Sequence, residues 1–139
     1  MRYLLDTCVI SETAARLPQP KVLEFLDSLD PRRTFLSVLT IGELNRGIER
    51  VADEKKKQRL KRWLDEDVLV RFDGQIAPID TPVMLEWGRL MARLQARGRV
   101  LPAMDSLIAA TAVAGDFTLV TRNERDFTDT GVRLANPWA

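Results

Sequence analysis

Short apolar segments alternate with longer segments of helical periodicity along this 139-residue chain. Residues 3–5, 34–38 and 117–121 are rich in aromatic and branched side chains, which is typical of buried strands. Apolar residues recur at three- and four-residue spacing in five other segments: 22–29, 44–51, 53–66, 82–97 and 105–114. That spacing indicates helices. Strands that alternate with helices predict a three-layer α/β/α domain around a mainly parallel central sheet.

Three shorter segments complete the predicted organisation. Residues 68–70, 76–79 and 132–134 are expected to be extended. No repeat, low-complexity tract or long linker interrupts the chain, so we expect one domain over residues 1–139. No apolar run approaches the roughly 18 residues of a membrane span, and the first residues do not form a secretory leader. We therefore expect a cytoplasmic protein without a membrane partner.

The chain contains one cysteine and no histidine. These counts exclude an internal disulfide, a multi-cysteine metal site, a histidine general base and a Ser-His-Asp triad. They also exclude a zinc site of the usual type. Carboxylates, or a metal ion held by carboxylates, are therefore the expected catalysts if the chain is an enzyme.

A carboxylate interrupts the first apolar segment. Asp6 directly follows Leu4 and Leu5 and precedes the apolar residues 8–10. A charge in such surroundings must be paired, capped or bound to a ligand. Sites in parallel sheets gather at the carboxyl ends of the strands. Asp6 stands at the end of the first predicted strand, which makes it the first candidate site residue.

Three other acidic residues stand at comparable junctions. Glu43 is placed in the first turn of the helix after the second strand. Asp105 begins the alanine-rich helix, and Asp126 lies just beyond the strand that ends at residue 121. Because the carboxyl ends of parallel strands meet at one edge of a sheet, these acids are expected to converge on Asp6.

Each acid also has a structural explanation when it is considered alone. Asp6 and Asp105 would cap helices by accepting a hydrogen bond from a free backbone amide. Thr40 and Glu43 match the capping box, in which the glutamate reaches back to the threonine amide. Asp126 would only close a turn. The sequence alone leaves these explanations open.

Taken together, the four acids favour a metal site. Carboxylates that converge repel one another, and burial further disfavours their charged forms. A divalent cation removes that conflict, and oxygen ligands without histidine or thiolate suit Mg²⁺ or Mn²⁺. One such ion, or a pair of them, can activate a water molecule and stabilise the charge that develops on a phosphodiester.

The basic residues are unevenly distributed. They gather in residues 54–62 and again at Arg89, Arg93, Arg97 and Arg99. The first three of these arginines are spaced four residues apart, which places them on one helical face. That face is either a solvated helix surface or a patch for a polyanion. The second interpretation predicts Arg89, Arg93 and Arg97 as contacts for an RNA backbone.

Four motifs follow one another along the chain: Leu4-Leu5-Asp6-Thr7, Thr40-Ile41-Gly42-Glu43-Leu44, residues 104–112, and Val120-Thr121-Arg122-Asn123. In their order and approximate spacing they resemble the motifs of PIN-domain ribonucleases, and more closely those of the VapC and FitB toxins of bacterial toxin–antitoxin modules. The resemblance runs from Met1 to the closing Asn136-Pro137-Trp138. It implies a PIN-like fold.

The resemblance also implies roles for individual residues. Asp6, Glu43 and Asp105 correspond to the first three metal-binding acids of the family, with Asp6 and Asp105 as the principal ligands. Thr7 corresponds to the hydroxyl neighbour of the first acid.

The fourth acidic position is occupied in one of two ways in the family. Some relatives have an aspartate where this chain has Asn123, and others have asparagine there and an acid three residues later. The second pattern matches this chain, so we expect Asp126 to be the fourth catalytic acid. Thr121 and Asn123 are expected to support the site by hydrogen bonds.

The activity implied by the resemblance is Mg²⁺- or Mn²⁺-dependent endonucleolytic cleavage of RNA, in which a metal-activated water attacks the phosphorus. The chain would be the toxin of a type II toxin–antitoxin system. Its partner would be an antitoxin similar to VapB or FitA, whose apolar C-terminal segment packs between toxin helices while an arginine reaches the acidic pocket. The toxin is expected to form a homodimer and to contact operator DNA only through the antitoxin.

Two other classes of function remain possible. An aspartate after the first strand can be a phosphoryl-transfer nucleophile, but dehalogenase-like phosphatases have a second aspartate where this chain has Cys8. A receiver domain would have a lysine near Thr121 and Arg122. The other alternative is a non-catalytic PIN-like module that acts with an antitoxin in DNA-bound repression, although the motif acids are retained.

Overall fold

The strand β1 (Arg2–Leu5) lies at the centre of a five-stranded sheet, and every neighbouring pair of strands is parallel. The computed structural model describes residues 1–139. The strands lie side by side in the order β3 (Ile76–Ala77), β2 (Thr34–Ser37), β1, β4 (Phe117–Val120) and β5 (Arg133–Ala135). The predicted parallel sheet is confirmed. Because all strands point the same way, their carboxyl ends share one edge of the sheet.

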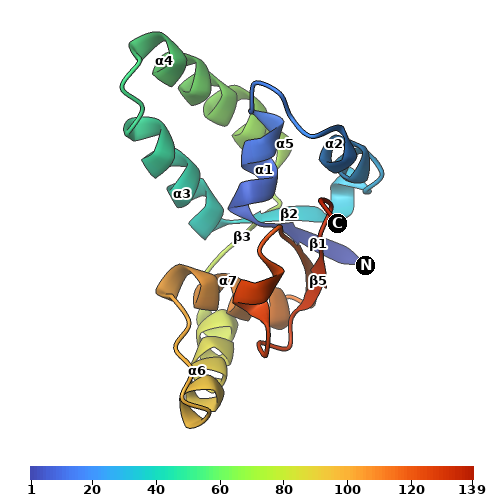
Figure 1. Cartoon of the computed structure of the whole chain (residues 1–139), viewed down its shortest axis with the longest axis vertical. Coiled ribbons are helices and arrows are strands. Elements are labelled where there is room, and N and C mark those ends of the chain that lie inside the picture. Colours follow the sequence, from blue (N-terminus) through green and yellow to red (C-terminus); the bar gives the residue numbers. More distant parts are fainter.

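Helices cover both faces of this sheet, which gives the predicted three layers (Figure 1). One face is covered by α1 (Thr7–Thr13), α2 (Pro20–Asp27), α3 (Val38–Glu49), α4 (Glu54–Arg62) and α5 (Leu69–Arg71). The other face is covered by α6 (Thr81–Ala96) and α7 (Ala103–Ala114). None of these helices is both long and apolar enough to cross a membrane.

The core is divided by the sheet into two clusters. Leu5 and Val120 point into the cluster beneath α1 to α5, whereas Leu4 and Leu119 point into the cluster beneath α6 and α7. All four side chains are fully buried. Successive strand residues alternate between the two faces, so a strand covered on both faces is mostly apolar along its whole length.

The segment 68–70 is helical, so the predicted extended structure there is wrong. After α4 the chain continues through a π-helical turn (Trp63–Val68) into α5. Leu64, Val68 and Phe72 recur at four-residue spacing and all three are buried in the core. Burial of this helical face overrides the preference of the branched residues for extended structure.

The two remaining predicted strands are present with shifted ends. β3 is an edge strand and covers only Ile76–Ala77, the first two of the four expected residues. β5 covers Arg133–Ala135, one residue later than expected.

Candidate functional site

Asp6 joins the central strand to α1 at the carboxyl edge of the sheet. Its amide donates to the carbonyl of Val120 on β4 at 2.9 Å. One carboxylate oxygen accepts from the Thr7 amide at 2.8 Å, and the other accepts from the Thr121 hydroxyl at 2.8 Å. The predicted cap at Asp6 is therefore confirmed. The second hydrogen bond, from the neighbouring strand's end, is more than a cap requires.

The surroundings of Asp6 disfavour its negative charge in spite of these bonds. Burial raises the pKa of Asp6, and the nearby charge of Asp126 raises it further. The hydrogen bonds from Thr121 and Thr7 act in the opposite direction without cancelling the effect of burial. A cation beside Asp6 would favour the charged form.

Thr121 connects Asp6 to the segment after β4. This buried side chain donates to Asp6 and accepts from the Asn123 amide at 3.0 Å. The support from Asn123 in this structure comes from its backbone, because its side chain is exposed and has no hydrogen bond of its own.

Glu43 is linked to Asp6 through Thr7. The Thr7 hydroxyl donates to Glu43 Oε1 at 2.6 Å and lies 3.2 Å from the Thr40 hydroxyl. The expected capping box is wrong, because α3 begins at Val38 and its cap is Ser37, which accepts from the Leu39 amide. Glu43 therefore lies in the second turn, not the first. Its carboxylate is free of a capping role and faces the end of β1.

Asp105 has no hydrogen-bonding partner. It lies in the first turn of α7, but the residue at the cap position is Pro102, so the capping explanation for Asp105 is wrong. Burial raises the pKa of Asp105, and the charges of Asp126, Asp6 and Glu43 raise it further, in that order. The four predicted acids are thus close enough for Asp105 to respond to the other three.

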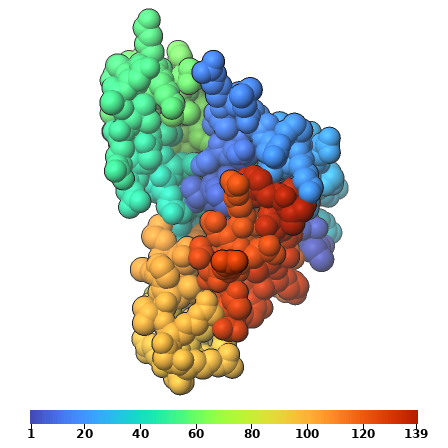
Figure 2. Space-filling view, in the orientation of Figure 1, coloured from blue at the N-terminus to red at the C-terminus, as the bar shows by residue number.

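Ser106 positions the start of α7, and the sequence gave no reason to single it out. Its hydroxyl accepts from the Trp87 indole of α6 at 2.9 Å and donates to the Ala103 carbonyl at 2.7 Å. These bonds connect the first turn of α7 to the middle of α6. In Figure 2 the surfaces of α3 (teal) and of this turn (orange) adjoin on the left-hand side of the molecule.

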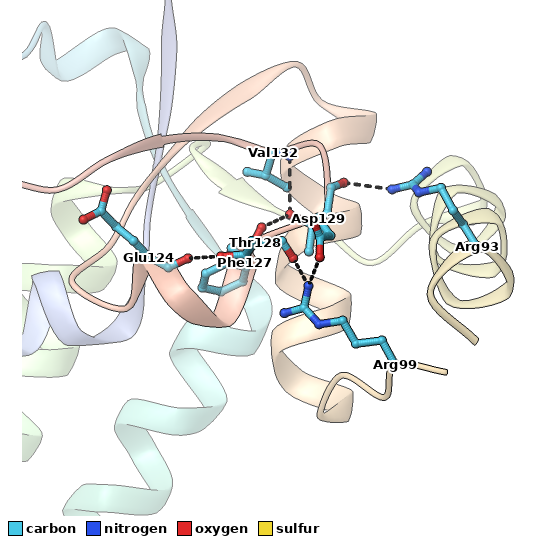
Figure 3. Close-up of polar contacts among 8 residues, drawn as sticks. Arg93, Arg99, Glu124, Phe127, Thr128, Asp129 and Val132 are labelled. Atoms are coloured by element: carbon cyan, nitrogen blue, oxygen red, sulfur yellow. Dashed lines mark hydrogen bonds and ion pairs between the residues drawn. The ribbon is translucent and has the colours of Figure 1, made fainter. Parts of the chain in front are cut away.

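Asp126 lies in an exposed 3₁₀ turn (Glu124–Phe127) after β4. The loop that follows is held by two arginines, as Figure 3 shows. Arg93 of α6 donates to the Thr130 carbonyl at 3.1 Å. Arg99 donates to the Thr128 carbonyl and pairs with Asp129 at 2.8 Å. The loop directly after the fourth acid is therefore bound to α6 and to the segment that follows it.

The other two predicted RNA contacts, Arg89 and Arg97, differ in whether they form an ion pair. Arg89 pairs with Glu86 at 2.6 Å, whereas Arg97 is exposed at the end of the helix and forms no ion pair. Arg89 and Arg93 thus have partners within the protein, whereas Arg97 has none. The helical spacing correctly placed Arg89 and Arg93 in one helix and Arg97 at its C-cap, but it did not indicate what they contact.

Cys8 also adjoins the site. Its sulfur lies 3.9 Å from a carboxylate oxygen of Asp6 and 3.8 Å from the Thr121 hydroxyl. Burial raises the pKa of the Cys8 thiol, so it stays protonated near neutral pH. The thiol is a weak hydrogen-bond donor to Asp6.

The fold and the site define a class: small parallel α/β domains in which acids from separate segments converge at the carboxyl edge of the sheet. A model of the PIN domain matches residues 3–132. The chain belongs to the PIN-domain family.

Two named proteins resemble the chain over nearly its whole length. It is 36% identical to Toxin FitB of Neisseria gonorrhoeae, with 97% of each chain covered. It is 33% identical to VapC ribonuclease Y4jK of Sinorhizobium fredii, with 97% of this chain and 96% of the relative covered.

Solved structures agree with these sequences. The crystal structure of FitAcB from Neisseria gonorrhoeae matches with a TM-score of 0.93 at 36% identity, over 98% of each chain. The structure of FitAB bound to an IR36 DNA fragment matches with a TM-score of 0.92 at 34% identity, over 99% of this chain and 96% of that one.

Proposed function

We propose that this chain is a metal-dependent endoribonuclease and the toxin of a type II toxin–antitoxin system. The observation that carries the proposal is the crowding of Asp105 by three acids from other segments, with no cation among the groups that shift its pKa. Such repulsion disfavours the charged carboxylates, and a bound cation would relieve it. The relatives named as a toxin and as a VapC ribonuclease support the same function.

The side chains fit Mg²⁺ or Mn²⁺ in donor type, because all four acids offer oxygen ligands. No three acidic or thiol groups are close enough together to enclose a metal ion directly. Mg²⁺ keeps several waters and contacts few carboxylates directly, so it does not require three acids to enclose it. Asp6 and Asp105 would hold the ion, and Glu43 and Asp126 would act on its waters. When bound, the ion supplies an activated water and neutralises charge on the phosphodiester.

The neighbouring residues fix the orientation of two of these acids. The amide of Thr7 and the hydroxyl of Thr121 each hold one oxygen of Asp6, and the hydroxyl of Thr7 holds Glu43. Asp105 is fixed only through the helix that carries it. The chain thus combines two oriented carboxylates with one unbonded carboxylate, which is available to a cation.

An antitoxin is proposed as the protein partner. A groove of about 280 Å³ lies between α1, α3 and α4, and apolar side chains of Leu44, Ile48, Leu60 and Trp63 line it. Thr7 and Glu43 line the same groove, so it leads to the acidic site. An extended segment with apolar side chains and a terminal cation would fit there. The relative solved as FitAB on DNA supports contact with operator DNA through the antitoxin, and the homodimer remains a proposal.

The function is tested by incubating end-labelled small RNAs with the purified protein in Mg²⁺, in Mn²⁺ and in chelator. We expect discrete metal-dependent fragments, and a loss of roughly a hundredfold or more in rate for Asp105→Asn. The matched control is Asp53→Asn, which changes an exposed helix cap away from the site. Absence of cleavage with either metal, or equal cleavage by Asp105→Asn, would favour the non-catalytic repressor.

A further inference from the structure

Two residues beside the site, Arg122 and Trp138, contact each other. Arg122 directly follows Thr121, whose hydroxyl bonds to Asp6. The guanidinium carbon of Arg122 lies 5.3 Å from the centre of the Trp138 ring, within the range of a cation–π contact. Their separation in the sequence is large, so the fold brings them together at the carboxyl end of β4.

The end of the chain holds the Trp138 ring in place. The Thr121 amide donates to the Ala135 carbonyl at 3.0 Å, which joins the end of β5 to the residue after β4. The Trp138 amide donates to the Asn136 side chain at 2.9 Å, and that side chain donates to Glu124 at 3.0 Å. The ring itself packs against the core cluster that contains Leu5 and Val120. It is a fixed platform for the guanidinium.

Arg122, like Arg97, has no acidic or carbonyl partner, whereas three arginines on α6 and directly after it do have one. Arg89 pairs with Glu86, Arg93 bonds to a loop carbonyl, and Arg99 pairs with Asp129. Arg122 is exposed and forms no ion pair. The contact with the Trp138 ring leaves the guanidinium N–H groups of Arg122 without a protein acceptor, and these groups match the oxygens of a phosphate.

We propose that Arg122, held on the Trp138 ring, binds a phosphate of the substrate strand next to the acidic site. This assignment deepens the proposed function and rests on it. Four carboxylates repel an RNA backbone, so a fixed cation at the rim of the site would keep the strand there. Arg122 contacts the substrate, and Trp138 is a positioning residue that acts through Arg122.

The test measures binding of a short fluorescein-labelled single-stranded RNA by anisotropy at a series of potassium chloride concentrations. The background is Asp105→Asn, to prevent cleavage. We expect Arg122→Ala to weaken binding roughly tenfold and to make the slope of log affinity against log salt less steep by about 0.7. Arg122→Lys should keep the slope and lose part of the affinity. Trp138→Leu should weaken binding with the slope unchanged, because the charge remains.

The charge-matched control is Arg32→Ala, an exposed arginine paired only with Asp30 at the start of β2. It should bind like the parent. If Arg122→Ala and the parent showed equal affinity and equal slope, the assignment would be overturned. The proposed function would still hold as long as the unchanged protein cleaved RNA. Absence of both RNA binding and cleavage in the unchanged protein would overturn the proposed function and this assignment with it.

Discussion

Asp6 and Asp105 lie at the same edge of the sheet but differ in their hydrogen bonds and in the charges around them. Asp6 caps α1 and accepts hydrogen bonds from two threonines. Asp105 accepts none, and the charges of three other acids act on it. Burial raises the pKa of both carboxyl groups. Asp6 therefore has a structural role as a helix cap, whereas Asp105 forms no hydrogen bond that would give it such a role.

The largest difference is expected from alanine substitutions in the absence of metal. Asp6→Ala should lower the melting temperature by about 5 °C or more, because α1 loses its cap and the buried Thr121 hydroxyl loses its acceptor. Asp105→Ala should raise it by roughly 1–3 °C, because no hydrogen bond is lost, repulsion is relieved and alanine favours a helix. Thermal unfolding followed by circular dichroism measures both.

The matched control for Asp6→Ala is Asp53→Ala, which removes the exposed cap of α4 without touching the site. It should cost less than Asp6→Ala. If Asp105→Ala lowered the melting temperature as much as Asp6→Ala does, Asp105 would also support the fold. The two residues would then not differ in their contribution to stability.

A smaller effect is expected from pH. The pKa values of Asp6 and Asp105 are raised above the ordinary 3.8. Between 3.8 and the raised values the folded state binds more protons than the unfolded state, so stability falls as the pH rises through this window. Lowering the pH of the metal-free protein from about 7 into the window should therefore raise its melting temperature slightly.

Two other acidic residues oppose this rise in melting temperature when the pH is lowered further. A hydrogen bond from the Arg32 amide lowers the pKa of Asp30, and one from Lys61 lowers the pKa of Glu49. Stability that depends on these charges is lost as the pH falls through their lowered pKa values. Asp105→Asn should show a smaller gain than the unchanged protein, and Mg²⁺ should suppress it. An equal gain in Asp105→Asn would mean that Asp105 does not titrate in this window.

The candidate acids were predictable because each follows a recognisable sequence boundary. Asp6 ends an apolar strand, and Asp105 begins an alanine-rich helix. Parallel topology then requires such positions to meet at one edge. The threonine–glutamate pair at 40 and 43 was less informative, because its spacing fits a capping box while Ser37, three residues earlier, is the actual cap.

Contacts between distant segments could not be predicted in this way. The spacing of Arg93 shows which face of α6 it occupies, but not that this face meets the Thr130 carbonyl, 37 residues further along. The helix through Leu69 could not be predicted either. Its branched residues favour extended structure, and only burial of Val68 and Phe72 makes it helical. Local patterns specify a face, and the tertiary fold specifies what covers it.

The central claim, that the four acids form a cation site, is tested most directly by isothermal titration of Mn²⁺ into the metal-free protein. The account predicts saturable binding by the unchanged protein, at least about tenfold weaker binding by Asp6→Asn and by Asp105→Asn, and no change in Asp53→Asn. The claim would be contradicted if the unchanged protein showed no saturable binding, or if both site variants bound Mn²⁺ as tightly as the unchanged protein.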